Sequence, residues 1–362
     1  ILKTEPKNLT MMHLPTLLKV LKEKKENVES QGNALGVLCD LCAKSVDNRE
    51  KVIKLGGIQI SLDAMKRYPS DDLIQKSGCA ALQNLAFGDG RITIAKMGGI
   101  KVILDAIKRR KSNANMVKKG LGALNNLIAN VENKKTLTKL DGIRLTLDML
   151  KRHTSDAFLV WVASTMIICF ADGNTENQKT IARMDGIKVI IDAMKKHQAN
   201  AAAQETACGA LGELAQDNPD NQKSIEKMGG IKMILDAMKR HEPNWKVQIR
   251  GCDAIANLVN NDNRMKIVTM GGIKVILDAK KKHESNEIQR RSDRAFRNLR
   301  AANDEEKEII QDIQKFINVM KRRDVPLDLQ RQTCYELEML ALKSAHDRNT
   351  IAKMSGIKVF LN

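Results

Sequence analysis

Residues 186–196 read GIKVIIDAMKK, and this stretch decides the fold. Its regularly spaced apolar residues are Ile187, Ile190, Ile191 and Met194. That spacing places them on one face of an amphipathic helix. The same pattern returns as GIKVILDAIKR at 99–109, GIKMILDAMKR at 230–240 and GIKVILDAKKK at 272–282. A chain that repeats one helix in this way predicts a repeat architecture rather than a single globular core.

The Gly-Ile pair at the start of this segment fixes the repeat length. Its isoleucines are Ile58, Ile100, Ile143, Ile187, Ile231, Ile273 and Ile357, at intervals of 42, 43, 44, 44, 42 and 84 residues. The double interval divides at Ile313, where Asp312 replaces the glycine, and counting back from Ile58 reaches Leu14 in a degenerate first copy. A period near 42 is too long for ankyrin or tetratricopeptide units of about 33 or 34 residues.

Three helices are predicted in each unit. The first is short, as in Asn177 to Met184, with Asn177 as its N-cap and Gly186 ending the turn. The second is Ile187 to Lys196, and the third is long, as in Asp71 to Phe87 of the second unit. This order resembles the armadillo repeat. The resemblance covers nearly the whole chain and implies an all-α, right-handed armadillo-type α-solenoid whose third helices line a concave groove.

The predicted domain organisation is a single armadillo repeat array over 1–362. Its degenerate first repeat is 14–47, and the last segment, 347–362, starts a further repeat. Between these we expect repeats at 48–89, 90–132, 133–176, 177–220, 221–262, 263–303 and 304–346.

The sequence contains no motif that indicates an enzyme. Glycine pairs such as Gly98-Gly99 end a helix, and no phosphate loop, nucleophile elbow or paired acid and base is present. We therefore expect no catalytic residue and no cofactor. The longest uncharged apolar stretch, Phe158 to Ala171, is shorter than the roughly 18 residues of a membrane helix and is predicted to be a buried core helix.

Cysteine and histidine recur in phase with the repeat. One cysteine phase holds Cys79, Cys208, Cys252 and Cys334. These are predicted to be small core residues of a reducing compartment, so we expect a cytoplasmic protein. The Cys39-x-x-Cys42 motif lies within one helix without a second pair. The histidines are His153, His197, His241 and His283, and other units carry Tyr68 or Arg110 at that phase. Stacked units hold them about 10 Å apart, too far to share one metal, so no metal site is expected.

The chain carries a net charge of +18 and only 3% aromatic residues. Each second helix has an Asp four residues before a base: Asp63 and Arg67, Asp105 and Arg109, Asp148 and Arg152, Asp192 and Lys196, Asp236 and Arg240, Asp278 and Lys282. Such pairs are predicted to form a solvated outer ridge that supports each helix. The alternative is a positive ridge, extended by Lys101, Arg144, Lys188, Lys232 and Lys274, for an acidic partner, RNA or anionic lipid. The scarcity of aromatic residues makes sequence-specific nucleic-acid binding a minority hypothesis.

The armadillo resemblance implies that partners bind in the groove. Import receptors of that family use a Trp followed four residues later by an Asn. The Trp array is absent here, but the Asn phase keeps Asn84, Asn126, Asn257 and Asn298. Each Asn either clamps a partner's backbone or bonds its own neighbouring helix. The remaining groove candidates are Lys76, Lys118, Trp161, Arg290, Arg294 and Arg297.

Two features of these candidates carry a functional hypothesis. The spacing of Arg290, Arg294 and Arg297 puts three guanidinium groups on one helix face, which suits carboxylates or phosphates. Trp161 is either an exposed anchor or a residue that packs against the neighbouring repeat.

Two classes of function follow. The first is a non-enzymatic scaffold or adaptor whose groove binds an extended or acidic segment of a protein partner. The alternative is a structural subunit of a large assembly whose basic surface contacts an anionic neighbour such as RNA, tubulin or an acidic protein.

Overall fold

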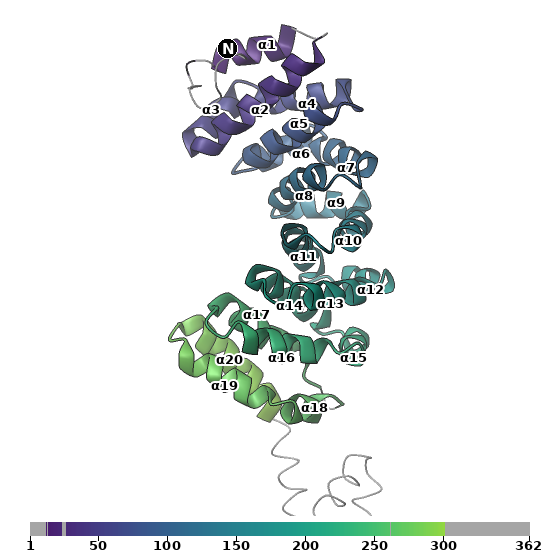
Figure 1. The fold of residues 1–362 in the computed structure, drawn as a ribbon, viewed down its shortest axis with the longest axis vertical. Helices are drawn as coiled ribbons and strands as arrows, with labels where there is room; N and C mark the ends of the chain where they lie inside the picture. Colours follow the sequence, from purple (N-terminus) through teal and green to yellow (C-terminus); the bar gives the residue numbers. More distant parts are fainter. Residues whose placement is uncertain (1–11, 13, 24–26, 261, 301–362) are drawn as a thin grey trace, which may run out of the picture.

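A computed structural model describes residue 12 and residues 14–23, 27–260 and 262–300. Within this part of the chain there are twenty helices and no strand. Figure 1 shows them stacked along one long axis, with the N-terminal helices at the top and α18 to α20 at the bottom. The all-α fold predicted from the repeat is confirmed for the described residues.

The helices fall into three classes that alternate along the chain. The first helices are α3 (Val46–Lys54), α6 (Gly90–Lys96), α9 (Val131–Lys139), α12 (Thr175–Arg183), α15 (Pro219–Lys227) and α18 (Arg264–Thr269). The second helices are α1 (Leu14–Glu23), α4 (Gly57–Arg67), α7 (Gly99–Arg109), α10 (Gly142–Arg152), α13 (Gly186–Lys196), α16 (Gly230–Arg240) and α19 (Gly272–Lys282). The third helices are α2 (Val28–Lys44), α5 (Asp72–Leu85), α8 (Ala114–Leu127), α11 (Ala157–Ala171), α14 (Ala201–Ala215), α17 (Trp245–Leu258) and α20 (Asn286–Arg300).

One hydrophobic core runs the length of the stack, from Leu14 to Leu299. Each unit contributes the apolar face of its second helix, such as Ile187, Ile190 and Met194, all of which are buried. The predicted core helix is α11, whose Phe170 is fully buried. A solenoid of this kind is held together by contacts between neighbouring units.

The turn between the first and second helices corrects our reading of the glycine pairs. The first glycine of each pair, such as Gly98, adopts a left-handed conformation. Asp185, which replaces this glycine in its own unit, adopts the same conformation with φ of 61°. The second residue opens the second helix instead of ending the first. A Cβ on Gly186 would lie 2.7 Å from the carbonyl oxygen of Ile181 and 2.5 Å from its Cγ2. Close packing therefore requires glycine at the second position, whereas the first accepts Asp.

The predicted N-cap of the first helix was wrong by one turn. Asn174 caps α12 by accepting a hydrogen bond from the Asn177 backbone nitrogen at 2.9 Å. Asn177 is buried, and its Nδ2 donates to the Phe170 carbonyl oxygen at 2.8 Å. Two asparagines three residues apart are both plausible caps, and the buried position of the second decides between them.

Candidate binding surfaces

The third helices pack side by side and form one continuous face, with α2, α5, α8 and α11 following one another down the stack (Figure 1). We call this face the groove. Helices α14 and α17 pack very closely: a Cβ added to Gly212 of α14 would lie 3.0 Å from the Cα of Ala254 in α17. On the same helix Gly209 leaves room for the Arg250 side chain, whose Cδ would be 3.2 Å from an added Cβ.

The four groove asparagines each bond the preceding third helix. Their Nδ2 atoms donate across the repeat: Asn84 to Cys39 O at 3.0 Å, Asn126 to Gln83 O at 2.9 Å, Asn257 to Gly212 O at 3.0 Å and Asn298 to Ala256 O at 2.9 Å. Of the two alternatives, the bond to the neighbouring helix is therefore made at all four positions. Their side-chain oxygens have no described partner at Asn84, Asn126 and Asn298.

The two groove lysines differ in their surroundings. Lys76 is exposed on α5 and has no ion pair among the described residues. Lys118 on α8 lies 2.6 Å from the carboxylate of Asp156, the N-cap of α11. Burial alone would raise the pKa of Asp156, but the hydrogen bonds from Lys118 and from the α11 backbone lower it. Lys118 therefore joins two units, and Lys76 is left facing solvent.

The arginines of α20 do not all have the same role. Arg291 pairs with Asp253 of α17 at 2.9 Å, and Arg294 hydrogen-bonds the Asn257 side chain and lies 3.7 Å from the same Asp253. Arg290 and Arg297 are exposed, and neither has an acidic partner within the described residues. The acid that faces Arg291 and Arg294 is thus Asp253, whereas Asp293 of the same helix pairs with Lys280.

The two tryptophans lie on third helices on either side of α14. Trp161 on α11 is half-buried, and its ring packs against Phe158 with 5.5 Å between centroids. Trp245 is the first residue of α17 and is 49% exposed. The ammonium of Lys246 lies 5.6 Å from the centre of its ring. Trp161 is therefore packed at least in part, and Trp245 is the more accessible aromatic.

Sequence reasoning missed Trp245, although a signal was present. The first residue of the third helix is Ala114, Ala157 or Ala201 in other units, so a Trp at this phase is an exception to the repeat. It lines a cleft of about 280 Å³ together with Glu205, Ile249, Arg250, Glu287 and Arg291. The cleft spans α14, α17 and α20 and combines an apolar wall with both signs of charge.

Glu213 lies half-buried on α14, on the face formed by the third helices. Burial raises the pKa of its carboxyl, and the neighbouring carboxylates of Asp172 and Asp253 raise it further, against the opposing effect of Arg250. The surroundings of Glu213 therefore favour its protonated form more than solvent does.

The second helices form a different surface, which we call the ridge. It comprises the solvent-facing side of α4, α7, α10, α13, α16 and α19. Of the six predicted Asp-to-base pairs, the ion pairs among the described residues include only Asp148 with Arg152, at 2.9 Å. Asp105 and Asp236 instead pair with the lysines four residues before them, Lys101 and Lys232. The pattern of one acid per helix holds, and the acid can pair in either direction because bases lie one helical turn away on both sides of it.

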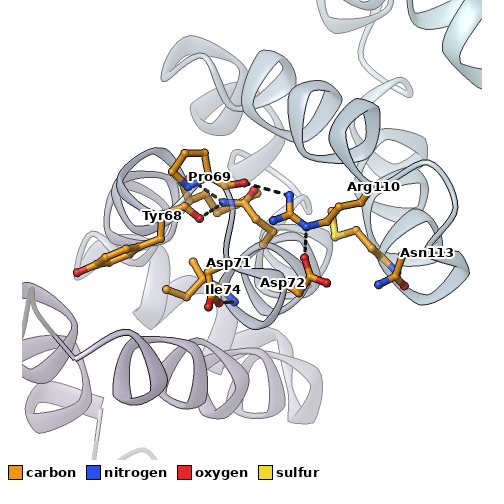
Figure 2. Close-up of polar contacts among 10 residues, drawn as sticks. Tyr68, Pro69, Asp71, Asp72, Ile74, Arg110 and Asn113 are labelled. Carbon is orange, nitrogen blue, oxygen red and sulfur yellow. Dashed lines mark hydrogen bonds and ion pairs between the residues drawn. The ribbon is translucent and has the colours of Figure 1, made fainter.

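The recurring histidines link neighbouring units. Nε2 of His153, His197, His241 and His283 lies between 2.6 and 2.9 Å from a carbonyl oxygen of the preceding unit. Arg110 takes this place in its own unit, as Figure 2 shows. Its Nε donates to the Asp72 carboxylate at 2.5 Å and its Nη1 to the Pro69 carbonyl oxygen at 3.0 Å. This contact recurs in five successive units, from Arg110 to His283, and accounts for the phase of these residues.

The described cysteines are free thiols in or beside the core. Burial raises the pKa of Cys42, Cys79 and Cys208 to about 12 and that of Cys252 to about 11. Such thiols do not ionise at neutral pH, so they are poor nucleophiles and poor metal ligands. The described part of the chain holds no group of three or more His, Cys, Asp or Glu side chains suited to a metal ion. Cys334 lies outside it.

None of the described helices is both long enough and apolar enough to span a membrane.

Two family models match the chain. The GAC ARM domain matches residues 4–172, and the LRRK2 ARM repeat matches residues 143–325. A search of curated proteins found no match.

Solved structures share the fold at low sequence identity. An engineered protein is 18% identical with a TM-score of 0.62, covering 95% of this chain and 92% of its own. A chain from work on a phosphorylation switch in the cadherin and β-catenin interaction is 16% identical with a TM-score of 0.68, covering 87% and 64%. A designed armadillo repeat protein in complex with the peptide (KR)4 is 16% identical with a TM-score of 0.56, covering 68% and 99%.

These likenesses confirm the predicted armadillo-type solenoid, and one family model alone spans half of the sequence. The chain belongs to the armadillo-repeat family.

Proposed function

We propose that this protein is a non-enzymatic scaffold or adaptor that binds an extended segment of a partner protein in its groove. Armadillo-repeat solenoids commonly bind proteins, and the neighbours include a designed member in complex with a peptide. The buried, protonated cysteines of the described units suit a reducing compartment such as the cytoplasm.

One observation carries the proposal: several side chains in the groove or at its edge are exposed and have no partner of their own in the described fold. Arg290 and Arg297 have no acidic partner among the described residues, and Trp245 is half exposed at the mouth of a cleft. Exposed arginine and tryptophan are the residues that most often dominate the energy of protein interfaces. A partner segment with an apolar side chain over Trp245 and acidic residues over α20 would use both.

A second candidate function is a structural subunit whose basic ridge contacts an anionic neighbour. It is favoured by a different observation. The ridge helices carry three exposed bases to one acid on α7, α10, α13 and α16, and eight of these twelve bases make no ion pair with a described residue.

Capture from a cell extract tests the groove proposal. The variant Arg290→Glu with Arg297→Glu reverses two charges that make no ion pair within the described fold, so the solenoid should stay folded. We expect mass spectrometry to show loss of the proteins that the unaltered chain captures. If the arginines are desolvated in the complex, the loss corresponds to about 2 to 5 kcal/mol of binding free energy.

The matched control is Lys179→Glu with Lys223→Glu, which makes the same charge change on the first helices α12 and α15. Both lysines are exposed and without an ion pair in the described region. Equal loss in the control would mean that overall charge, and not the groove, retains the partners, and the proposal would be abandoned.

A further inference from the structure

The fifth residue of the third helices occupies one repeat position, and its chemical character changes along the stack. From α5 to α20 the residues at this position are Lys76, Lys118, Trp161, Glu205, Ile249 and Arg290. Because neighbouring third helices pack side by side, these positions follow one another along the groove (Figure 1). We call them the groove row. Successive members are roughly 8 to 10 Å apart, the usual distance between packed helices.

Glu205 is the acid of the groove row. Its side chain is half-buried on α14 and makes no hydrogen bond or ion pair with a described residue. The neighbouring acids Asp253 and Glu287 both have a partner in Arg291, at 2.9 and 3.5 Å. A carboxylate that is shielded from water without gaining a partner is costly. Glu205 is therefore able to bind a cation that the described fold does not supply.

The arginine that lines the same cleft, Arg250, does not neutralise Glu205. Its side chain lies against Gly209, where an added Cβ would be 3.2 Å from Cδ and 3.5 Å from Nε. Burial raises the pKa of Glu213, and the charge of Arg250 opposes that effect. Arg250 and Glu205 form no ion pair within the described fold. Arg250 thus interacts with Glu213, and Glu205 keeps no partner.

Apolar surface lies on both sides of Glu205 along the groove row. On the α11 side, Trp161 is half-buried, and Phe158, whose ring packs against it, is 40% exposed. On the α17 side, Ile249 and the exposed Trp245 line the cleft that Glu205 also lines. A cation bound at Glu205 would therefore lie between two apolar surfaces.

The positions beyond these apolar surfaces are basic. Arg290 on α20 is exposed and has no ion pair with a described residue. On the other side, Lys118 on α8 pairs with Asp156, and Lys76 on α5 is exposed without an ion pair. From α8 to α20 the groove row thus reads base, apolar, acid, apolar, base. This order is the same in both directions along the groove.

We propose that the partner segment places a lysine or arginine against Glu205, with an apolar residue on either side of it and acidic residues further out. An extended segment rises about 3.3 Å per residue, so roughly 8 to 10 Å corresponds to two or three residues between successive anchors. The inference rests on the proposed function and adds which side chains the segment carries. Because the order is symmetric, it holds for either direction of the segment.

The charges of the groove row distinguish this segment from simpler ones. A uniformly acidic segment would place a like charge against Glu205. A uniformly basic segment would place like charges against Arg290 and Lys76. An apolar segment would cover Glu205 and leave its carboxylate buried without a partner. The mixed pattern avoids all three costs.

Peptide display tests the pattern without a known partner. A library of random peptides of about 15 residues, long enough to extend from α8 to α20, is selected on the full chain, and the bound peptides are sequenced. The test variants are Glu205→Lys and Glu205→Gln, with circular dichroism to check that both are folded. The matched control is Glu50→Lys, which makes the same charge change at an exposed residue of α3 without an ion pair in the described fold.

We expect peptides selected on the unaltered chain to share a lysine or arginine, with an apolar residue two or three positions away on each side and acids further out. A peptide of this pattern should bind Glu205→Lys about tenfold or more weakly, because an attraction becomes a repulsion. Glu205→Gln should lie between the two. Selection on Glu205→Lys should replace the central base by an acid, and the control should keep the original pattern.

The groove variant Arg290→Glu with Arg297→Glu separates failure of this inference from failure of the proposed function. Peptides that lose binding to that variant but carry no central base, or keep it on Glu205→Lys, would overturn the inference and leave the proposed function standing. The same change of pattern in Glu50→Lys would assign the selection to overall charge and overturn the inference. Selection of no peptide, or of peptides that bind every variant equally, would count against the proposed function as well.

Discussion

The third helices and the second helices carry their charged residues in two different arrangements. In the groove, charges cross from one unit to the next, as in Lys118 to Asp156 and Arg291 to Asp253. On the ridge, the same charge repeats at the same helix position in successive units, and most bases make no ion pair with a described residue. Charges such as Lys118 and Arg291, which lie between two third helices, are paired there, because an unpaired charge against a neighbouring helix is costly. Exposed ones such as Lys76, Arg290 and Arg297 lack an ion pair among the described residues. Ridge charges stay in solvent, so stacking can align them in rows.

The largest expected effect tests the packing side of this comparison. Gly212→Leu adds a side chain where even a Cβ would lie 3.0 Å from the Ala254 backbone. We expect a loss of roughly 1 to 3 kcal/mol in unfolding free energy, because the α14 and α17 backbones have to move apart. The ridge variant Lys151→Ala should change stability by no more than about 0.5 kcal/mol. Chemical denaturation followed by circular dichroism measures both, and similar midpoints would show that the groove is not tightly packed.

A smaller effect separates the structural role of the groove asparagines from a binding role. Asn126→Ala removes the hydrogen bond to the Gln83 carbonyl oxygen, and we expect a loss of about 0.5 to 1.5 kcal/mol in unfolding free energy. Asn115 is an exposed asparagine of the same helix without a hydrogen bond to a described residue, so Asn115→Ala is the control. Equal stability of the two variants would argue that the bond across the repeat contributes nothing.

The smallest expected effect concerns pH. Because the folded protein raises the pKa of Glu213, it binds a proton there more tightly than the unfolded chain does. The contribution of this residue is therefore retained below its ordinary pKa of 4.5 and lost as pH rises through the raised value. We expect Glu213→Gln to melt at the same temperature as the unaltered chain at low pH and slightly higher at neutral pH. A variant that is less stable at neutral pH would show that ionised Glu213 is held favourably by Arg250.

The repeat made the fold predictable, because Gly and Ile at intervals near 43 residues determine both the helix order and the core. The site was predictable only in part. Asn126 could bond outward or across the repeat, and the choice depends on a carbonyl 43 residues away. The partner of Arg291, Asp253, is likewise distant in sequence. Trp245 is not at a repeat position that the armadillo resemblance assigns to partner binding. It could be identified as a candidate only from the structure, where α14, α17 and α20 together form a cleft at this residue.

On the ridge, the position of each base could be predicted from the sequence. Which bases form ion pairs could not. The sequence predicted that Asp105 pairs with Arg109. In the structure Asp105 pairs with Lys101 instead. Which charges remain free is a property of side-chain packing, and i,i+4 spacing alone allows either direction.

The central claim is that the groove binds an extended segment of a partner protein and that the ridge is not needed for this binding. Capture of partner proteins from a cell extract, quantified by mass spectrometry after nuclease treatment, tests it most directly. We expect Arg290→Glu with Arg297→Glu to lose the captured proteins. We expect Arg144→Gln, Lys151→Gln and Lys188→Gln to keep them. Parallel loss in both variants would contradict the claim and indicate one shared electrostatic surface.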